Sequence, residues 1–341
     1  MAKLLKDFEW TGRSDGEGEA HARIHNCINT EKPADNFIVG FASDEGVERN
    51  HGRIGAAQAP NLIRKQLAGF AVHKPLFIQD LGTVSCEDSN LENAQTLLAE
   101  TILPHLSEHN KNIVLGGGHE VAFGSLLATT QYARSQNKKL GIINFDAHFD
   151  LREPPKTPEP PEFHVFSNSL KSGQPPEIKK TLNTPQDWTH GYSTSGTPFY
   201  QGLHAYDNAK YMALGIATQS NTKILFDRAN ALGVQYILDY EMITKPLAQL
   251  VSAIDEFLEQ IDILHLSIDL DVFPQSQAPG VSAPAPLGVG YNIVHPLLRH
   301  IFKSNKTLLL EVAELNPNYD IDSRTAKLAA HIVYEFAHGG L

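Results

Sequence analysis

The feature that most restricts the fold is a regular alternation of short apolar runs and longer amphipathic runs along nearly the whole chain. The apolar runs are mostly continuous, which is typical of strands that are buried on both faces. We predict eight strands, at Phe37–Phe41, Leu76–Gln79, Asn112–Leu115, Leu140–Phe145, Tyr211–Ile216, Val234–Leu238, Ile263–Ile268 and Thr307–Val312. We predict helices between them, at about Pro60–Leu67, Leu91–Leu106, Val121–Arg134, Thr222–Leu232, Met242–Gln260, Tyr291–Phe302 and Ser323–Phe336. This alternation indicates an α/β fold with a parallel sheet, in which ligands bind at the carboxyl ends of the strands.

One segment, from Glu153 to Thr194, interrupts the alternation because it is polar and rich in proline. Proline removes backbone donors and the composition offers little to bury, so we predict a long surface insertion at 153–194, near the mouth of any site built on the preceding strand. A functional lid and a neutral insertion are both open interpretations. No repeat or composition shift marks a boundary elsewhere, so we predict that residues 1–341 form a single domain.

Charge and composition narrow the possible partners. The chain has 28 Lys and Arg against 39 Asp and Glu, a formal net charge of −11, which disfavours nucleic acid and anionic membrane surfaces as partners. Its apolar runs are far shorter than the ~18 residues of a membrane span. The first residues do not resemble a signal peptide, and two cysteines, Cys27 and Cys86, cannot form a disulfide framework. We therefore expect a soluble, cytoplasmic globular protein with neither a nucleic-acid nor a membrane partner. Separately from the composition, we expect a homo-oligomer that acts on a small-molecule substrate.

The third predicted strand is followed by Gly116-Gly117-Gly118-His119-Glu120. The glycines permit a tight turn that would place His119 at the carboxyl end of that strand. Neither of the common phosphate-loop patterns is present, and the second histidine of the HExxH zinc motif is missing. Taken alone, His119 is better explained as a structural or capping residue than as a ligand.

Two further predicted strands end in carboxylates. After Leu140–Phe145, three potential ligands at i, i+2 and i+4 would share one face in extended geometry, although a polar loop with helix-capping aspartates is an alternative. After Ile263–Ile268, two aspartates stand two positions apart. With the histidine above, the strand ends supply His119, Asp146, His148, Asp150, Asp269 and Asp271. Such a set suits two divalent cations with bridging carboxylates, most naturally Mn²⁺, whereas zinc more often recruits thiolates or additional histidines.

In this order, the sequences GGGHE, DAHFD, SIDLD and EVAELNP resemble the motifs of the ureohydrolase family, which includes arginases, agmatinases and formiminoglutamases. The resemblance runs from about Gly40 to the C-terminus, outside the proline-rich segment. It implies a three-layer α/β/α sandwich around an eight-stranded, mostly parallel sheet, with two Mn²⁺ ions per chain. It assigns one ion to His119 and Asp150, the other to His148 and Asp271, and bridging positions to Asp146 and Asp269.

Within the family, several details are similar to the formiminoglutamase branch. Arg152 follows DAHFD where arginases have a neutral asparagine, and Ser195 replaces a histidine that shuttles protons in arginases and agmatinases. Residues 219–222 are neutral where arginase binds a free α-ammonium group. Formiminoglutamate has two carboxylates and no free α-ammonium, so an added arginine and a missing acid match it. The resemblance therefore implies hydrolysis of N-formimino-L-glutamate to L-glutamate and formamide, in histidine degradation.

The resemblance also implies roles for individual residues. Glu314 would bind the amidine group, Asp150 would carry a proton to the departing amine, and Arg152 would bind a substrate carboxylate. Ser195, Gly196 and Thr197 would complete the substrate-binding segment.

Two alternatives stay open at this point. One is another ureohydrolase that acts on a guanidino acid, such as a guanidinobutyrase or an arginase. The other is a metal-binding relative without catalytic activity. We expect the remaining histidines, including His51, His265 and His331, to be structural.

Overall fold

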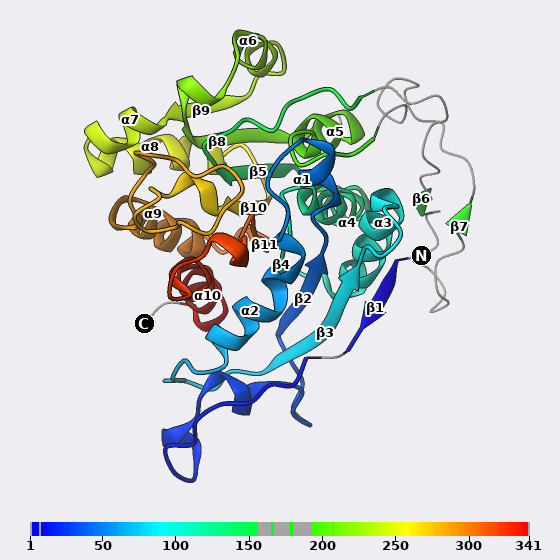
Figure 1. The fold of residues 1–341 in the computed structure, drawn as a ribbon, viewed down its shortest axis with the longest axis vertical. Helices are drawn as coiled ribbons and strands as arrows, with labels where there is room; N and C mark the ends of the chain where they lie inside the picture. Colours follow the sequence, from blue (N-terminus) through cyan, green and yellow to red (C-terminus); the bar gives the residue numbers. More distant parts are fainter. Residues whose placement is uncertain are drawn as a thin grey trace.

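A nine-stranded sheet, with strand order β1-β3-β2-β4-β11-β10-β5-β8-β9, forms the centre of the molecule (Figure 1). The structure is a computed structural model that describes residues 2–6, 8–155, 165–166, 178–179, 192–206 and 208–339. The strands of this sheet are β1 (Lys3–Leu5), β2 (Asn36–Ala42), β3 (Ile78–Ser85), β4 (Lys111–Leu115), β5 (Leu140–Phe145), β8 (Lys210–Ile216), β9 (Gln235–Leu238), β10 (Ile263–Asp269) and β11 (Thr307–Ala313). All neighbours pair in parallel except β1, which is antiparallel to β3 at one edge.

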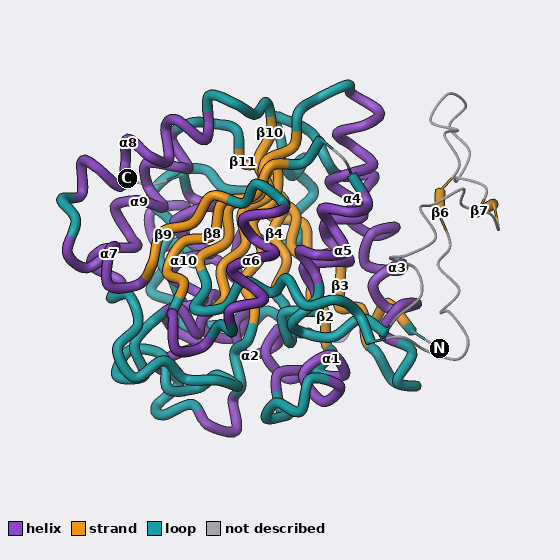
Figure 2. The backbone as a smooth tube through the Cα atoms, turned by 90° about the horizontal axis from the view of Figure 1, so that it is seen from above, coloured by secondary structure: helices purple, strands orange, loops and turns teal. Residues whose placement is uncertain are grey.

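Helices cover both faces of this sheet (Figure 2). They are α1 (Glu45–Arg49), α2 (Ala59–Leu67), α3 (Leu91–Ile102), α4 (Val121–Gln136), α5 (Pro198–Ala205), α6 (Lys223–Ala231), α7 (Asp239–Thr244), α8 (Leu247–Leu258), α9 (Tyr291–Lys303) and α10 (Arg324–His338). Apolar side chains of α2, α8, α9 and α10 form one core with the sheet, and those of α3 and α4 form another. The predicted three-layer α/β/α architecture is therefore confirmed. None of the helices in the described part of the chain is long and apolar enough to span a membrane.

Several predicted elements differ from those observed. The sheet has a ninth strand, β1, and the strand predicted at Leu76–Gln79 is β3, which begins at Ile78 and extends to Ser85. The helix predicted at Met242–Gln260 is two helices, α7 and α8. Lys245 separates them with an extended backbone (φ −72°, ψ 144°), because the residue before a proline disfavours the helical region. The short helices α1 and α5 were not predicted.

The proline-rich insertion predicted at 153–194 lies largely outside the described residues, which there include two short antiparallel strands, β6 (Val165–Phe166) and β7 (Ile178–Lys179). Its two described ends lie together. The backbone N–H of Tyr192 donates to the carbonyl of Pro155 at 3.1 Å, and the backbone N–H of Arg152 donates to the carbonyl of Gly196 at 2.9 Å. The insertion therefore leaves and rejoins the fold at one place, between β5 and α5.

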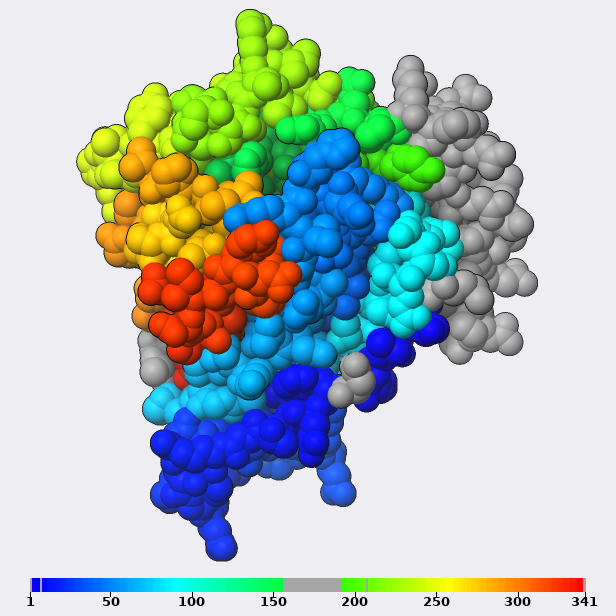
Figure 3. Space-filling view, in the orientation of Figure 1, coloured from blue at the N-terminus to red at the C-terminus, as the bar shows by residue number. Residues whose placement is uncertain are grey.

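The segment that carries α1 lies against the segment that follows β11. In the space-filling view, the blue surface around α1 meets the orange-red surface that follows β11 (Figure 3). Asn316 joins the two segments, since its Nδ2 donates to the carbonyls of Arg53 at 2.8 Å and Ile54 at 3.1 Å. This contact joins the segment after α1 to the segment that follows the carboxyl end of β11.

Candidate metal centre

Four adjacent strands, β4, β11, β10 and β5, end at the same edge of the sheet, and each carries or precedes predicted site residues. Parallel strands present their carboxyl ends together, and their connecting loops form a crevice there. His119 follows β4, and Asp269 is the last residue of β10. The remaining predicted residues follow β5 (Asp146, His148, Asp150), β10 (Asp271) and β11 (Glu314).

The six predicted ligands form two overlapping groups, in each of which the ligand atoms lie within 4.8 Å of one another. The first group is His119, Asp146, Asp150 and Asp269, and the second is Asp146, His148 and Asp271. Asp146 belongs to both groups, which places it where a bridging carboxylate would lie. Asp269 belongs to the first group only, so its bridging role stays a prediction. Oxygen and imidazole ligands in this arrangement suit two neighbouring divalent cations.

Three carboxylates converge on one imidazole nitrogen. Nδ1 of His119 lies 3.2 Å from Oδ2 of Asp146, 2.9 Å from Oδ2 of Asp150 and 3.0 Å from Oδ2 of Asp269. His119 is 1% exposed and Asp146 is fully buried. Burying several ionised carboxylates together costs free energy unless a positive charge lies beside them. A bound cation would supply that charge.

The orientation of His119 also fits a metal ligand. Its Nε2 faces the hydroxyl of Ser267 at 2.9 Å, whereas its buried Nδ1 faces the three carboxylate oxygens. Histidines that bind metals commonly bond their second ring nitrogen to a neighbouring group, which fixes the ring and its tautomer. The Ser267 contact therefore leaves Nδ1 as the atom directed at the carboxylates.

Backbone and amide donors hold the central carboxylates in place. Asp146 accepts from the backbone N–H of His148 at 2.6 Å and from Nδ2 of Asn144 at 2.8 Å. Asp269 accepts from the backbone N–H of Asp271 at 2.7 Å. These contacts follow from the i, i+2 spacing at the strand ends, so the spacing noted in the sequence also organises the carboxylates.

The carboxylates of the site have divergent pKa values. Burial, together with the neighbouring Asp146, raises the pKa of Asp150 to about 6. Burial, together with Glu120, raises the pKa of Glu314 to about 8. Burial would raise the pKa of Asp146, but its hydrogen bonds with His119 and His148 lower it. The hydrogen bonds prevail, so the pKa of Asp146 is lowered. Of these three carboxylates, Asp146 therefore has the most strongly stabilised ionised form.

Glu314 is fixed beside the cluster by the glycine turn. Its Oε1 accepts from the backbone N–H of His119 at 2.8 Å, and its own N–H donates to the carbonyl of Gly117 at 2.8 Å. A Cβ on Gly117 would lie 1.9 Å from the carbonyl oxygen of Ser43, so only glycine fits there. Glu314 has a positive φ of 69°, an uncommon conformation that often marks functional positions.

The cluster opens into a cavity of about 340 Å³. Three residues predicted to bind substrate line it: Arg152, Ser195 and Glu314. Ser220 and Asn221, from the neutral segment 219–222, also line it.

Gly196 and Thr197, which were also predicted to bind substrate, do not line the cavity. Thr197 is buried, and its hydroxyl donates to Oε1 of Gln201 at 2.7 Å. We therefore propose that Gly196 and Thr197 shape the segment that carries Ser195.

Other residues of the cavity wall were not predicted. They include Asn50, His51, Arg53 and Ser282. His51 was expected to be structural, but it lies in the wall of the cavity. His265, also expected to be structural, is fully buried and lies 3.3 Å from Glu311.

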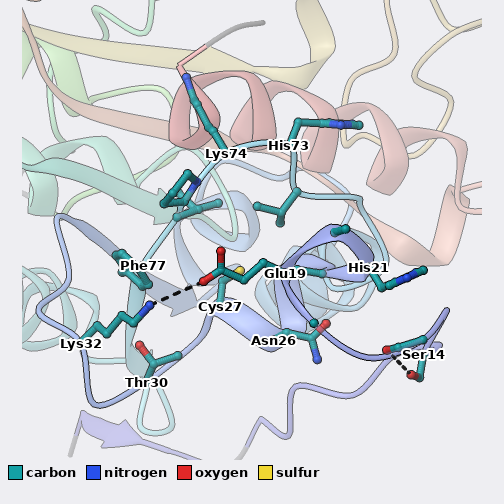
Figure 4. Close-up of a pocket in the computed structure, with 17 residues that line it drawn as sticks. Ser14, Glu19, His21, Asn26, Cys27, Thr30, Lys32, His73, Lys74 and Phe77 are labelled. Atoms are coloured by element: carbon teal, nitrogen blue, oxygen red, sulfur yellow. Dashed lines mark hydrogen bonds and ion pairs between the residues drawn. The ribbon is translucent and has the colours of Figure 1, made fainter.

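A larger cavity, of about 730 Å³, lies elsewhere (Figure 4). Residues between 14 and 32 and between 72 and 77 line it, and Lys32 forms an ion pair of 3.9 Å with Glu19 across part of it. Within the ranges that the structure describes, neither group of metal-ligating side chains includes a residue of this cavity. The chemistry, rather than the size, identifies the smaller cavity as the candidate site.

Several known proteins are similar to this chain in sequence or in fold. Residues 34–339 match the sequence model of the Arginase family. A formimidoylglutamase from Vibrio parahaemolyticus is 40% identical over 97% of this chain and 93% of its own length. The crystal structure of a Trypanosoma cruzi formiminoglutamase with Mn²⁺ has a TM-score of 0.72 and 22% identity, covering 93% of this chain and 98% of that one. A Bacillus subtilis formimidoylglutamase structure has a TM-score of 0.73 and 21% identity, covering 96% and 94%. The two structures share the fold of this chain.

Proposed function

The chain belongs to the arginase family, and from this premise we propose that it hydrolyses the amidine C–N bond of N-formimino-L-glutamate to give L-glutamate and formamide. The observation that carries the proposal is one cavity that contains the ligand cluster, the Glu314 carboxylate and the Arg152 guanidinium. The cluster and Glu314 suit a cationic amidine, whereas Arg152 suits a carboxylate. N-formimino-L-glutamate presents both groups on one molecule.

We propose two Mn²⁺ ions as the cofactor, held by His119 and the five other residues of the cluster. Four carboxylates and two imidazoles form a ligand set that is compatible with Mn²⁺, and the related Trypanosoma cruzi structure contains this metal. When bound, such a pair of cations acts as a Lewis acid and lowers the pKa of water at the site.

The chain's own side chains then bind and orient the substrate. Glu314, held by the His119 backbone N–H, accepts hydrogen bonds from the amidinium and fixes its position relative to the cluster. Arg152 binds a carboxylate at the mouth of the cavity. Asp150, with a carboxylate oxygen 2.9 Å from Nδ1 of His119, carries a proton to the nitrogen that becomes the amine of glutamate.

Product analysis on a panel of substrates tests the proposal. The Mn²⁺-loaded protein should release formamide and glutamate from formiminoglutamate. It should release little urea from 4-guanidinobutyrate, arginine or agmatine. Preferential release of urea from a guanidino acid would favour the alternative ureohydrolase, and no product from any of them would favour a non-catalytic protein.

Asp146→Ala removes the ligand common to both groups and should abolish the activity. The cytoplasmic location, the homo-oligomeric state and the role in histidine degradation stay predictions from the sequence.

A further inference from the structure

We infer that helices α9 and α10 hold a second, separate metal site, in which His295, His331 and Glu335 bind one Zn²⁺ ion. We call these three residues the interhelical site. His295 lies on α9, and the other two residues lie on α10. The two helices pack side by side against the same core (Figure 1). Different residues line the cavity of the candidate metal centre, so the inference goes beyond the proposed function and does not depend on it.

Three polar atoms between these helices are buried and have no hydrogen-bond partner among the residues that the structure describes. They are Nε2 of His295, Oε2 of Glu335 and the hydroxyl oxygen of Tyr291. Tyr291 lies one turn before His295 on α9, and the centroids of the two rings are 5.1 Å apart. Buried polar atoms are nearly always hydrogen-bonded, so several exceptions at one place indicate a bound water molecule or ion.

The spacing of the histidine and the carboxylate suits a cation between them. Nε2 of His295 lies 3.7 Å from Oε2 of Glu335, which is beyond hydrogen-bond distance. Zinc binds such atoms at about 2.0–2.2 Å, so two ligands of a tetrahedral ion lie roughly 3.4 Å apart. His300, on the same helix, shows the alternative of a direct contact, because its Nε2 lies 2.6 Å from Oδ1 of Asp255.

His331, which was expected to be structural, supplies the third ligand. It lies one turn before Glu335, so the two side chains share a face of α10. The ring centroids of His331 and His295 are 6.1 Å apart. In the described ranges, the side chains whose ligand atoms already lie within 4.8 Å of one another are those of the candidate metal centre, so His331 must turn its ring toward the pair. His331 is exposed, and exposed side chains change rotamer rapidly.

The chemistry of the ligands favours zinc. Two imidazoles and one carboxylate are a ligand set that Zn²⁺ uses with water at the fourth position, whereas the carboxylate-rich candidate metal centre suits Mn²⁺. Burial raises the pKa of Tyr291, so its hydroxyl keeps its proton and is a donor for such a water molecule. An ion held by both helices would link α9 to α10 and stabilise the folded state.

The test measures zinc and manganese in the same samples. The Mn²⁺-loaded protein is dialysed against low micromolar Zn²⁺ with Mn²⁺ in excess, and both metals are then quantified by mass spectrometry. The parent protein should retain one more Zn²⁺ per chain than His295→Gln or Glu335→Gln, while all three contain the same amount of manganese. His331→Gln changes an exposed position and should weaken zinc binding by about tenfold or more, because one of three protein ligands is lost.

His300→Gln is a matched control, since it removes a histidine of α9 that is bonded to a carboxylate outside the interhelical site. It should retain as much zinc as the parent protein. Equal zinc in the parent and His295→Gln, or an equal loss in His300→Gln, would overturn the inference.

Thermal unfolding gives a second measurement that needs only the exposed substitution. Zn²⁺ at about 100 times its Kd should raise the Tm of the parent by about 3 °C or more, and that of His331→Gln by about half as much or less. Equal shifts in the two proteins would also overturn the inference, and a water molecule would then account for the three unpaired atoms.

Discussion

Removing the hydroxyl of Ser267 should weaken cation binding without removing any ligand. The hydroxyl lies 2.9 Å from Nε2 of His119, on the side of the ring opposite the carboxylates. Ser267 is fully buried and His119 is 1% exposed, so water cannot readily replace the lost contact. When Nδ1 binds a cation, the ring proton must be on Nε2, and Ser267→Ala leaves that N–H without an acceptor.

The expected size follows from the cost of an unsatisfied buried donor, which is about 1–3 kcal/mol. This cost falls mainly on the cation-bound state, because the ring can change tautomer when no cation is present. We therefore expect the affinity for Mn²⁺ to fall by about 10- to 100-fold, the range known for contacts that orient metal ligands. At saturating Mn²⁺ the kcat should return to within about threefold of the parent value.

The assay is a titration of Mn²⁺ into the metal-free protein, followed by calorimetry and by activity. Ser125→Ala is a matched control, because it deletes the same atom at a fully buried position whose hydroxyl donates to Glu311 rather than to a predicted ligand. The control should change the Mn²⁺ affinity by less than about twofold, whatever it does to stability. Equal Mn²⁺ affinities for Ser267→Ala and the parent protein would refute the reasoning that Ser267 orients His119 for metal binding.

Three further predictions concern the cavity and its surroundings. Arg152→Ala should raise the KM for formiminoglutamate about 10- to 100-fold with little change in kcat, since a carboxylate loses its charged partner; steady-state kinetics with an unchanged KM would exclude that role. Replacing 156–191 by a short Gly/Ser linker should preserve metal content and Tm, because Pro155 and Tyr192 are already hydrogen-bonded neighbours, and should change KM several-fold. A variant that does not fold would show that the segment is structural, and unchanged kinetics would make it a neutral insertion. Burial raises the pKa of Glu120 to about 7 from a usual value of 4.5, so its contribution to stability is lost as the pH rises from about 4.5 to 7. Glu120→Gln cannot titrate, and between pH 5 and 8 the parent should lose roughly 2–3 kcal/mol of unfolding free energy relative to this variant in urea titrations; parallel pH profiles would contradict this.

The central strands could be predicted from sequence because their burial is continuous. β5 was predicted with its observed bounds, and β10 with a difference of one residue, since every residue of both strands is buried. The second half of β3 was missed, and it interrupts the apolar run with polar residues such as Asp80 and Thr83. In the fold, the fully buried Arg64 bonds both oxygens of Asp80 at 2.9 Å and the hydroxyl of Thr83 at 2.8 Å. This compensation comes from α2, so no local pattern could reveal it.

The candidate ligands were also predictable, because the i, i+2 spacing at strand ends directs carboxylates to one edge of the sheet. Site residues that lie on loops or at the ends of short helices have no such spacing in the sequence. Asn50 lies at the end of a five-residue helix and meets Ser195, which is 145 positions away in the chain. Neither residue type nor spacing predicts that contact. It depends on Gly46, Glu120 and the glycine turn, which fold against one another only when the sheet is complete.

The central claim is that the cavity above β4, β11, β10 and β5 hydrolyses the formimino group of formiminoglutamate. Its most direct test is ¹H NMR of the Mn²⁺-loaded protein mixed with N-formimino-L-glutamate. The account predicts that formamide and L-glutamate appear in equal amounts as the substrate disappears. No formamide from a protein that holds its cations would contradict it, as would N-formylglutamate in place of glutamate.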